Sequence, residues 1–70
     1  MNLKQRMVAE QLETLLDECH ELGLAGGVFG GNFCLWPEGV DPHSGKFFDV
    51  IEDKGEILDT KMSLDGGAGN

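Results

Sequence analysis

The sequence predicts a small α+β domain in which an N-terminal amphipathic helix packs on an antiparallel sheet of three or four strands, in the order α-β-β-β-β. Apolar residues recur at helical spacing over residues 3–22. After this segment the pattern changes to short β-prone runs separated by glycine-rich turns. The chain has 70 residues, which is enough for one domain. We expect this domain to cover residues 1–64, followed by a disordered tail at 65–70.

The helical segment carries its apolar residues on one side. A turn of 3.6 residues places the following on a single stripe: Leu3, Met7, Val8, Leu12, Leu15, Leu16, Cys19 and Leu22. Asn2 suits the N-cap position, and Gln5 follows at the spacing of a capping box. Gly23 suits the position after the helix, where a left-handed conformation closes the last turn. The rest of the chain is too small to bury this stripe well, which argues for a partner, first of all a second copy of the chain.

Residues 25–36 read AGGVFGGNFCLW and predict a tight hairpin. Its strands are expected near 27–30 and 33–36, with a Gly-Gly-Asn sequence at the turn. The alternative is a single bent strand with a glycine bulge. The next segment, 37–46, contains two prolines and two glycines and is expected to be a loop.

Two further strands are expected after this loop. Residues 47–52 resume strand character and predict a third strand, whereas Asp-Lys-Gly at 53–55 is suited to a turn. Residues 56–62 then form the return strand. This arrangement predicts no internal repeat and no boundary between domains.

The expected strands leave apolar side chains on both faces of the sheet, whereas one helix can cover only one face. The residues assigned to the second face, and therefore to a dimer interface, are Phe47, Ile51, Ile57 and Trp36. Soluble monomers seldom expose such a patch, and a pair of identical copies is the commonest closed assembly. We therefore expect a homodimer. In the alternative arrangement, Trp36 and Val40 cover this face within one chain.

The charge is firmly acidic, with 13 Asp and Glu against 5 Lys and Arg and a formal net charge of −8. This balance argues against direct binding of nucleic acids or of anionic membranes, because both need a cationic surface. It permits a basic protein surface or a cation as a partner. The candidate partner-binding residues form one line along the exposed side of the helix: Glu10, Glu13, Asp17 and Glu21. Such a line can also be a solvated surface without a function.

Candidate metal and catalytic residues do not form a recognisable motif. Cys19, His20, Cys34 and His43 lack the paired spacing of structural zinc sites. Cys34 stands in an apolar strand, which favours a buried and inert thiol. The glycines at 26–31 follow a helix and lead into strands, unlike those of phosphate-binding loops. We expect no catalytic site, no cofactor and no bound metal.

The function that these features favour is a non-catalytic protein-interaction module, such as a small regulator or inhibitor of another protein. One alternative is a mimic of DNA that occupies a nucleic-acid-binding site. Another is a small-ligand or metal-binding domain that uses the loop 37–46 with Trp36 and His43. The sequence has no apolar run that suits a membrane span or a signal peptide, so a cytoplasmic location is expected. Small acidic chains are common among accessory genes of phages and mobile elements, which by itself implies no activity.

Overall fold

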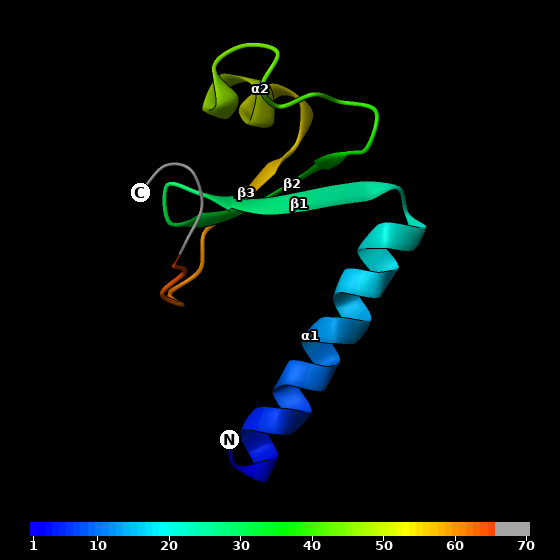
Figure 1. Ribbon diagram of the computed structural model, residues 1–70, viewed down its shortest axis with the longest axis vertical. Helices are drawn as coiled ribbons and strands as arrows, with labels where there is room; N and C mark the ends of the chain where they lie inside the picture. Colours follow the sequence, from blue (N-terminus) through cyan, green and yellow to red (C-terminus); the bar gives the residue numbers. More distant parts are fainter. Residues whose placement is uncertain (66–70) are drawn as a thin grey trace.

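The computed structural model describes residues 1–65 and confirms the α+β class. Its elements are α1 (Leu3–Glu21), β1 (Leu24–Phe29), β2 (Asn32–Pro37), α2 (Phe47–Lys54) and β3 (Glu56–Leu58). The three strands form one antiparallel sheet in the order β1-β2-β3, with α2 on one side and α1 extending from the other (Figure 1). The predicted disordered tail, apart from Asp65, lies outside the described residues.

Helix α1 begins and ends where the sequence predicts. The Asn2 side chain accepts a hydrogen bond of 2.8 Å from the N–H of Gln5, and the Gln5 side chain accepts one of 2.9 Å from the N–H of Asn2. This capping box satisfies two N–H groups at the start of the helix. At the other end, Gly23 has a φ of 76°, and its N–H donates to the carbonyl of His20. Glycine adopts this left-handed conformation without a steric penalty, so the chain can turn sharply into β1.

β1 and β2 form the predicted hairpin, not a bent strand. Ala25 lies opposite Trp36, and Phe29 lies opposite Asn32. The turn between them consists of Gly30 and Gly31, with φ values of 60° and 81°. Two consecutive residues with positive φ match the twist of a hairpin, and glycine meets this requirement at the lowest cost.

The segment predicted as a third strand is instead α2, so the order of elements is α-β-β-α-β. The segment has helical spacing: after Phe47, the residues three, four and seven positions later are Val50, Ile51 and Lys54. Asp49 in the first turn and Lys54 in the last turn also complement the helix dipole. A short apolar run fits a strand as well as a helix, and the predicted third strand is therefore wrong.

The last strand is shorter than the predicted 56–62. β3 pairs with β2 only from Leu58 opposite Phe33 to Glu56 opposite Leu35. Phe33 is the second residue of β2, and only Asn32 separates it from the turn that precedes the strand. Beyond Leu58, little of β2 is left to pair with, and the chain departs from the sheet.

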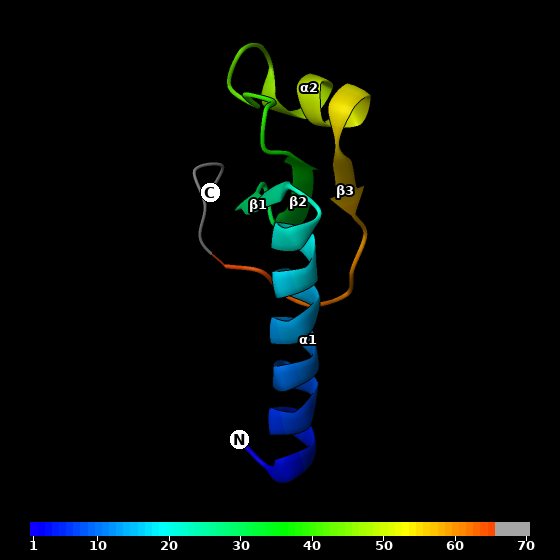
Figure 2. The same ribbon diagram turned by 90° about the vertical axis from the view of Figure 1, so that its right-hand side faces the viewer.

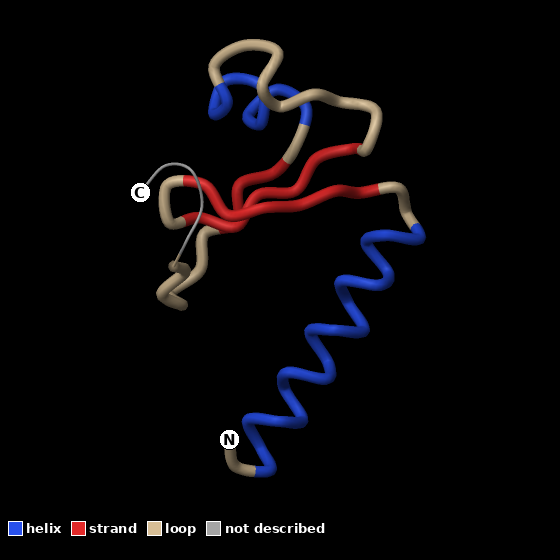
Figure 3. Tube along the Cα trace, viewed as in Figure 1, coloured by secondary structure: helices blue, strands red, loops and turns tan. Residues whose placement is uncertain are grey.

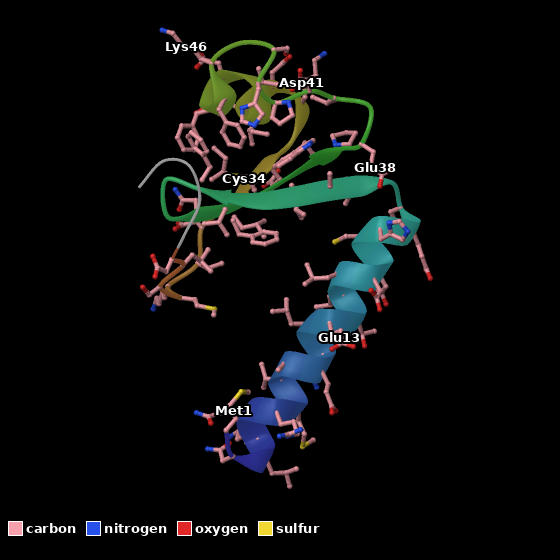
Figure 4. All side chains as sticks on the ribbon, viewed as in Figure 1. Met1, Glu13, Cys34, Glu38, Asp41 and Lys46 are labelled. Carbon is pink, nitrogen blue, oxygen red and sulfur yellow. The ribbon has the colours of Figure 1, made fainter. Side chains whose placement is uncertain are left out.

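The core lies between α2 and the sheet. Cys34 of β2 and Ile51 of α2 are fully buried, and Figure 4 shows Cys34 on the sheet. Three aromatic rings extend this core: Phe29 and Phe47 stack with ring centroids 4.2 Å apart, and Trp36 meets Phe47 edge to face at 5.9 Å. Such pairs stabilise a core beyond the area that they bury.

Helix α1, in contrast, does not lie flat on the sheet as expected. It contacts the sheet near its C-terminal end and then extends away from it (Figures 1 and 2). Figure 3 shows a short loop that joins this helix to the start of β1. None of its residues is buried. The radius of gyration is 13.3 Å, whereas a compact chain of this length has about 11 Å.

Candidate interaction surface

The apolar stripe of α1 is the largest exposed apolar feature of the described residues. Leu12, Leu15 and Leu16 keep 50%, 56% and 42% of their surface exposed. Helices in proteins gain most of their stability by packing such a stripe against other elements. A stripe left in solvent is therefore a candidate site for binding another polypeptide.

A groove opens between this stripe and the sheet. Its volume is about 270 Å³, and its lining residues are Leu12, Leu15, Leu16, Cys19, Phe33, Leu35, Leu58, Thr60 and Met62. All of them except Thr60 carry apolar side chains. The groove therefore offers shape and apolar surface to a ligand, with few groups for hydrogen bonding.

The sheet wall of the groove follows from strand alternation. Phe33 and Leu35 of β2 point to this face, and Leu58 lies opposite Phe33 on β3. On β1 the same face carries Gly26, where a Cβ atom would stand 3.0 Å from Cδ2 of Leu35. Because Gly26 has no side chain, Leu35 packs directly over the backbone of β1.

The angle between α1 and the sheet is fixed by contacts at Glu38. The N–H of Glu38 donates a hydrogen bond of 2.9 Å to the carbonyl of Gly23. Its carboxylate Oε1 also lies 3.8 Å from Nδ1 of His20. In Figure 4, Glu38 lies beside the C-terminal end of α1. This side-chain contact is exposed and adds little, so the backbone hydrogen bond and the Gly23 turn are the main restraints.

The predicted acidic line lies on the side of α1 opposite Leu12, Leu15 and Cys19. Leu3, which was assigned to the stripe, stands five full turns before Glu21 and therefore falls on the acidic side. The residues of the acidic line are all exposed: Glu10, Glu13, Asp17 and Glu21. In Figure 4 the carboxylate oxygens of the helix stand mainly on the side turned away from the groove. The structure thus separates an acidic outer surface from an apolar inner one. A role of the acidic line in binding stays a prediction.

The residues assigned to a second sheet face meet within one chain. Phe47 and Ile51 project from α2 toward the face that carries Trp36 and Ile57. Ile51 has no exposed surface to offer a partner. The apolar surface that remains open is on the opposite side of the sheet, beside α1.

The candidate nucleophile Cys34 is sealed in the core. Burial raises the pKa of its thiol above the ordinary value of 9.0, so the thiol stays protonated and poorly nucleophilic at neutral pH. His43 lies elsewhere in the loop 37–46, where its backbone N–H donates to Oδ1 of Asp41 at 2.9 Å. Its ring lies against Phe47 with centroids 5.5 Å apart. His43 and Trp36 thus both contact Phe47 and cover the core.

Within residues 1–65, no three His, Cys, Asp or Glu side chains are placed to hold a metal ion together. No helix in this part of the chain has the length and apolar character needed to cross a membrane. Comparison of the chain with family models, with curated proteins and with solved structures finds no match.

The groove was missed by sequence reasoning, although an exposed stripe on α1 was expected. Its helix wall could be read from helical spacing. Its sheet wall could not be predicted, because the position of the sheet beside α1 depends on the direction in which the chain leaves Gly23. That direction depends on the contacts of Glu38, which is distant in sequence. The available signal for the groove was the pair of apolar residues Leu58 and Met62 late in the sequence, which both line it.

Proposed function

We propose that the protein is a non-catalytic protein-interaction module whose groove, between α1 and the sheet, receives an apolar helix of another polypeptide. The exposed stripe of α1 carries this proposal. Burial of apolar surface is the main driving force of protein association, and this stripe is a continuous apolar strip on a preformed helix. A helix laid into such a groove buries its own apolar face together with that of α1.

The surface area of the chain supports a site of this size. The protein exposes 5480 Å², whereas a compact chain of its mass exposes about 4,300 Å². The excess of roughly 1,200 Å² exceeds the ~800 Å² that each side of a standard interface buries. Covering α1 would therefore bring the exposed surface close to that of an ordinary globular protein.

The native thiol of Cys19 provides a direct test, because it lines the groove. The chain is diluted until light scattering gives the mass of a monomer, and its thiols are alkylated with iodoacetamide. We expect Cys19 to react readily and Cys34 to react only on unfolding, since Cys34 is fully buried. Peptide mass mapping distinguishes the two sites.

The binding step uses a synthetic amphipathic helix of Leu and Lys as the probe. This peptide is expected to slow the alkylation of Cys19 at 0.15 M salt. A scrambled peptide of the same composition, without an apolar face, should not slow it. Leu15→Glu should abolish the protection, whereas Glu13→Gln on the outer side of α1 should retain it. The proposal fails if Cys19 is unreactive in the monomer, because the groove would then be closed within one chain.

A further inference from the structure

We infer that the helix that occupies the groove is α1 of a second copy of this chain, in antiparallel orientation. This inference rests on the proposed function and names the partner at the same site. The stripe of α1 includes Val8, Leu12, Leu15, Cys19 and Leu22, which follow one another in steps of four, three, four and three residues. This is the seven-residue repeat by which helices pack along a shared seam. A second α1 carries the same repeat, so two copies can pack along a shared seam.

The charges beside the seam select the antiparallel orientation. Lys4, Gln11 and Glu18 recur every seven residues along one edge of the stripe. When Leu12 of one copy faces the partner's Val8, Val8 also faces the partner's Leu12, and the pair is two-fold symmetric. Lys4 then lies beside the partner's Glu18, and Gln11 lies beside the partner's Gln11. Both ends of the seam thus gain an ion pair of opposite charges.

The parallel orientation offers no such complement. It would bring the acidic C-terminal turns of the two helices together, with Asp17, Glu18 and Glu21 in each copy. Within one chain these acids oppose the dipole of α1, and so do Lys4 and Arg6 at its start. In the antiparallel pair, each basic end meets an acidic end, so a placement that is unfavourable in the lone helix becomes favourable in the dimer.

The groove lies where the antiparallel helix needs it. In this register the first eight residues of the partner run beside residues 12–19 of α1, which form the helix wall of the groove. Cys19 then faces the partner's Met1, and Leu15 faces the partner's Gln5, the one polar residue on the seam. The two sheets then lie at opposite ends of the helix pair. The acidic line of each copy faces outward, which keeps these carboxylates away from the seam.

Charge reversal tests this pairing. We expect Lys4→Glu and Glu18→Lys each to weaken the dimer about ten-fold, because two attractive pairs become repulsive. Each substitution improves the dipole of α1, so a lost helix cannot explain the loss. The double variant K4E/E18K should recover the affinity, and the two single variants, when mixed, should prefer each other. Arg6→Glu and Glu13→Lys, off the seam, are the matched controls and should have little effect. The measurements are light scattering and sedimentation over a concentration series.

Cysteine cross-linking tests the orientation independently. In the Cys19→Ser background, Gln11→Cys should form a disulfide between copies on oxidation, whereas Glu13→Cys on the outer side should not. In the native chain, Cys19 should not cross-link to the partner's Cys19, because the antiparallel register separates them by about 27 Å. A Cys19 disulfide would show the parallel orientation and overturn the inference.

The outcomes separate this inference from the proposed function. A dimer in which Cys19 is protected from alkylation supports both. A monomer at all concentrations, in which the Leu–Lys peptide still protects Cys19, overturns the second copy and leaves the interaction module standing. A dimer in which Cys19 remains reactive uses another surface and also overturns the inference. A monomer in which Cys19 never reacts overturns the proposed function itself.

Discussion

Gly55 lies directly against the backbone carbonyl of Leu35, so closely that a Cβ atom at Gly55 would overlap the carbonyl oxygen. This added Cβ atom at Gly55 would also stand 3.1 Å from Cβ of Trp36. Gly55 caps α2, and its N–H donates a hydrogen bond of 2.8 Å to the carbonyl of Ile51. This contact sets how closely the end of α2 approaches β2, and therefore how tightly the aromatic core is closed.

The first prediction follows from this contact. We expect Gly55→Ala to lower the free energy of unfolding by about 2–3 kcal/mol, because strand backbone cannot move aside as a flexible side chain can. Gly39→Ala is the matched control, since a Cβ atom at Gly39 has nothing within 4 Å. It should change stability by less than about 0.5 kcal/mol. Urea unfolding followed by Trp36 fluorescence measures both, and equal effects of the two substitutions would contradict the close contact.

The second prediction concerns the pH dependence of stability. Burial raises the pKa of the Cys34 thiol above 9.0 in the folded chain, whereas the unfolded chain has the ordinary value. The stabilisation of the folded state relative to the unfolded state is therefore complete below pH 9 and is lost as the pH rises through the raised pKa.

The test compares the native chain with Cys34→Ala between pH 7 and pH 10.5. Cys34→Ala is less stable than the native chain at pH 7 because the substitution leaves a cavity. The difference in the free energy of unfolding between the two proteins should become smaller as the pH rises. Cys19→Ala, which removes a partly exposed thiol and leaves Cys34 in the core, is the matched cysteine control. A constant difference between the native chain and Cys34→Ala across this range would show that burial does not hold the thiol neutral.

The third prediction concerns the capping box of α1. Because α1 has little packing within its own chain, its stability in the monomer depends strongly on local interactions. Asn2→Ala removes the acceptor for the N–H of Gln5 and should cost the helix about 1 kcal/mol. Circular dichroism of the diluted monomer should show a clear loss of helix, whereas Asn2→Ser retains an acceptor and should largely preserve it. If α1 were firmly packed, both variants would keep their helical signal.

Local rules predicted the parts of the fold that local interactions decide. The capping box at Asn2, the left-handed turn at Gly23 and the hairpin closed by Gly30 and Gly31 each depend on neighbouring residues. The same rules were wrong for Phe47–Lys54, because an eight-residue segment fits both a strand and a helix. Contact with the sheet decides in favour of the helix, since it brings Phe47 onto Phe29 and Ile51 into the core.

The candidate site was predictable only in part for a related reason. The stripe and the acidic line of α1 follow from helical spacing, and the helix keeps Leu12, Leu15 and Cys19 on the side opposite the acidic line. The assignment of Phe47, Ile51, Ile57 and Trp36 to an exposed face depended on the strand at 47–52. Once this segment is a helix, it covers that face itself and leaves the other face open beside α1.

The exposed position of α1 also has a consequence for the lifetime of the protein. A helix with little tertiary packing opens often, so proteases reach its backbone long before they reach the sheet and α2. Limited digestion of a lone chain should therefore remove α1 first and leave the fragment that begins near Gly23. Occupation of the groove would shield the same peptide bonds, so the rate of proteolysis would depend on the fraction of the protein that is bound to its partner.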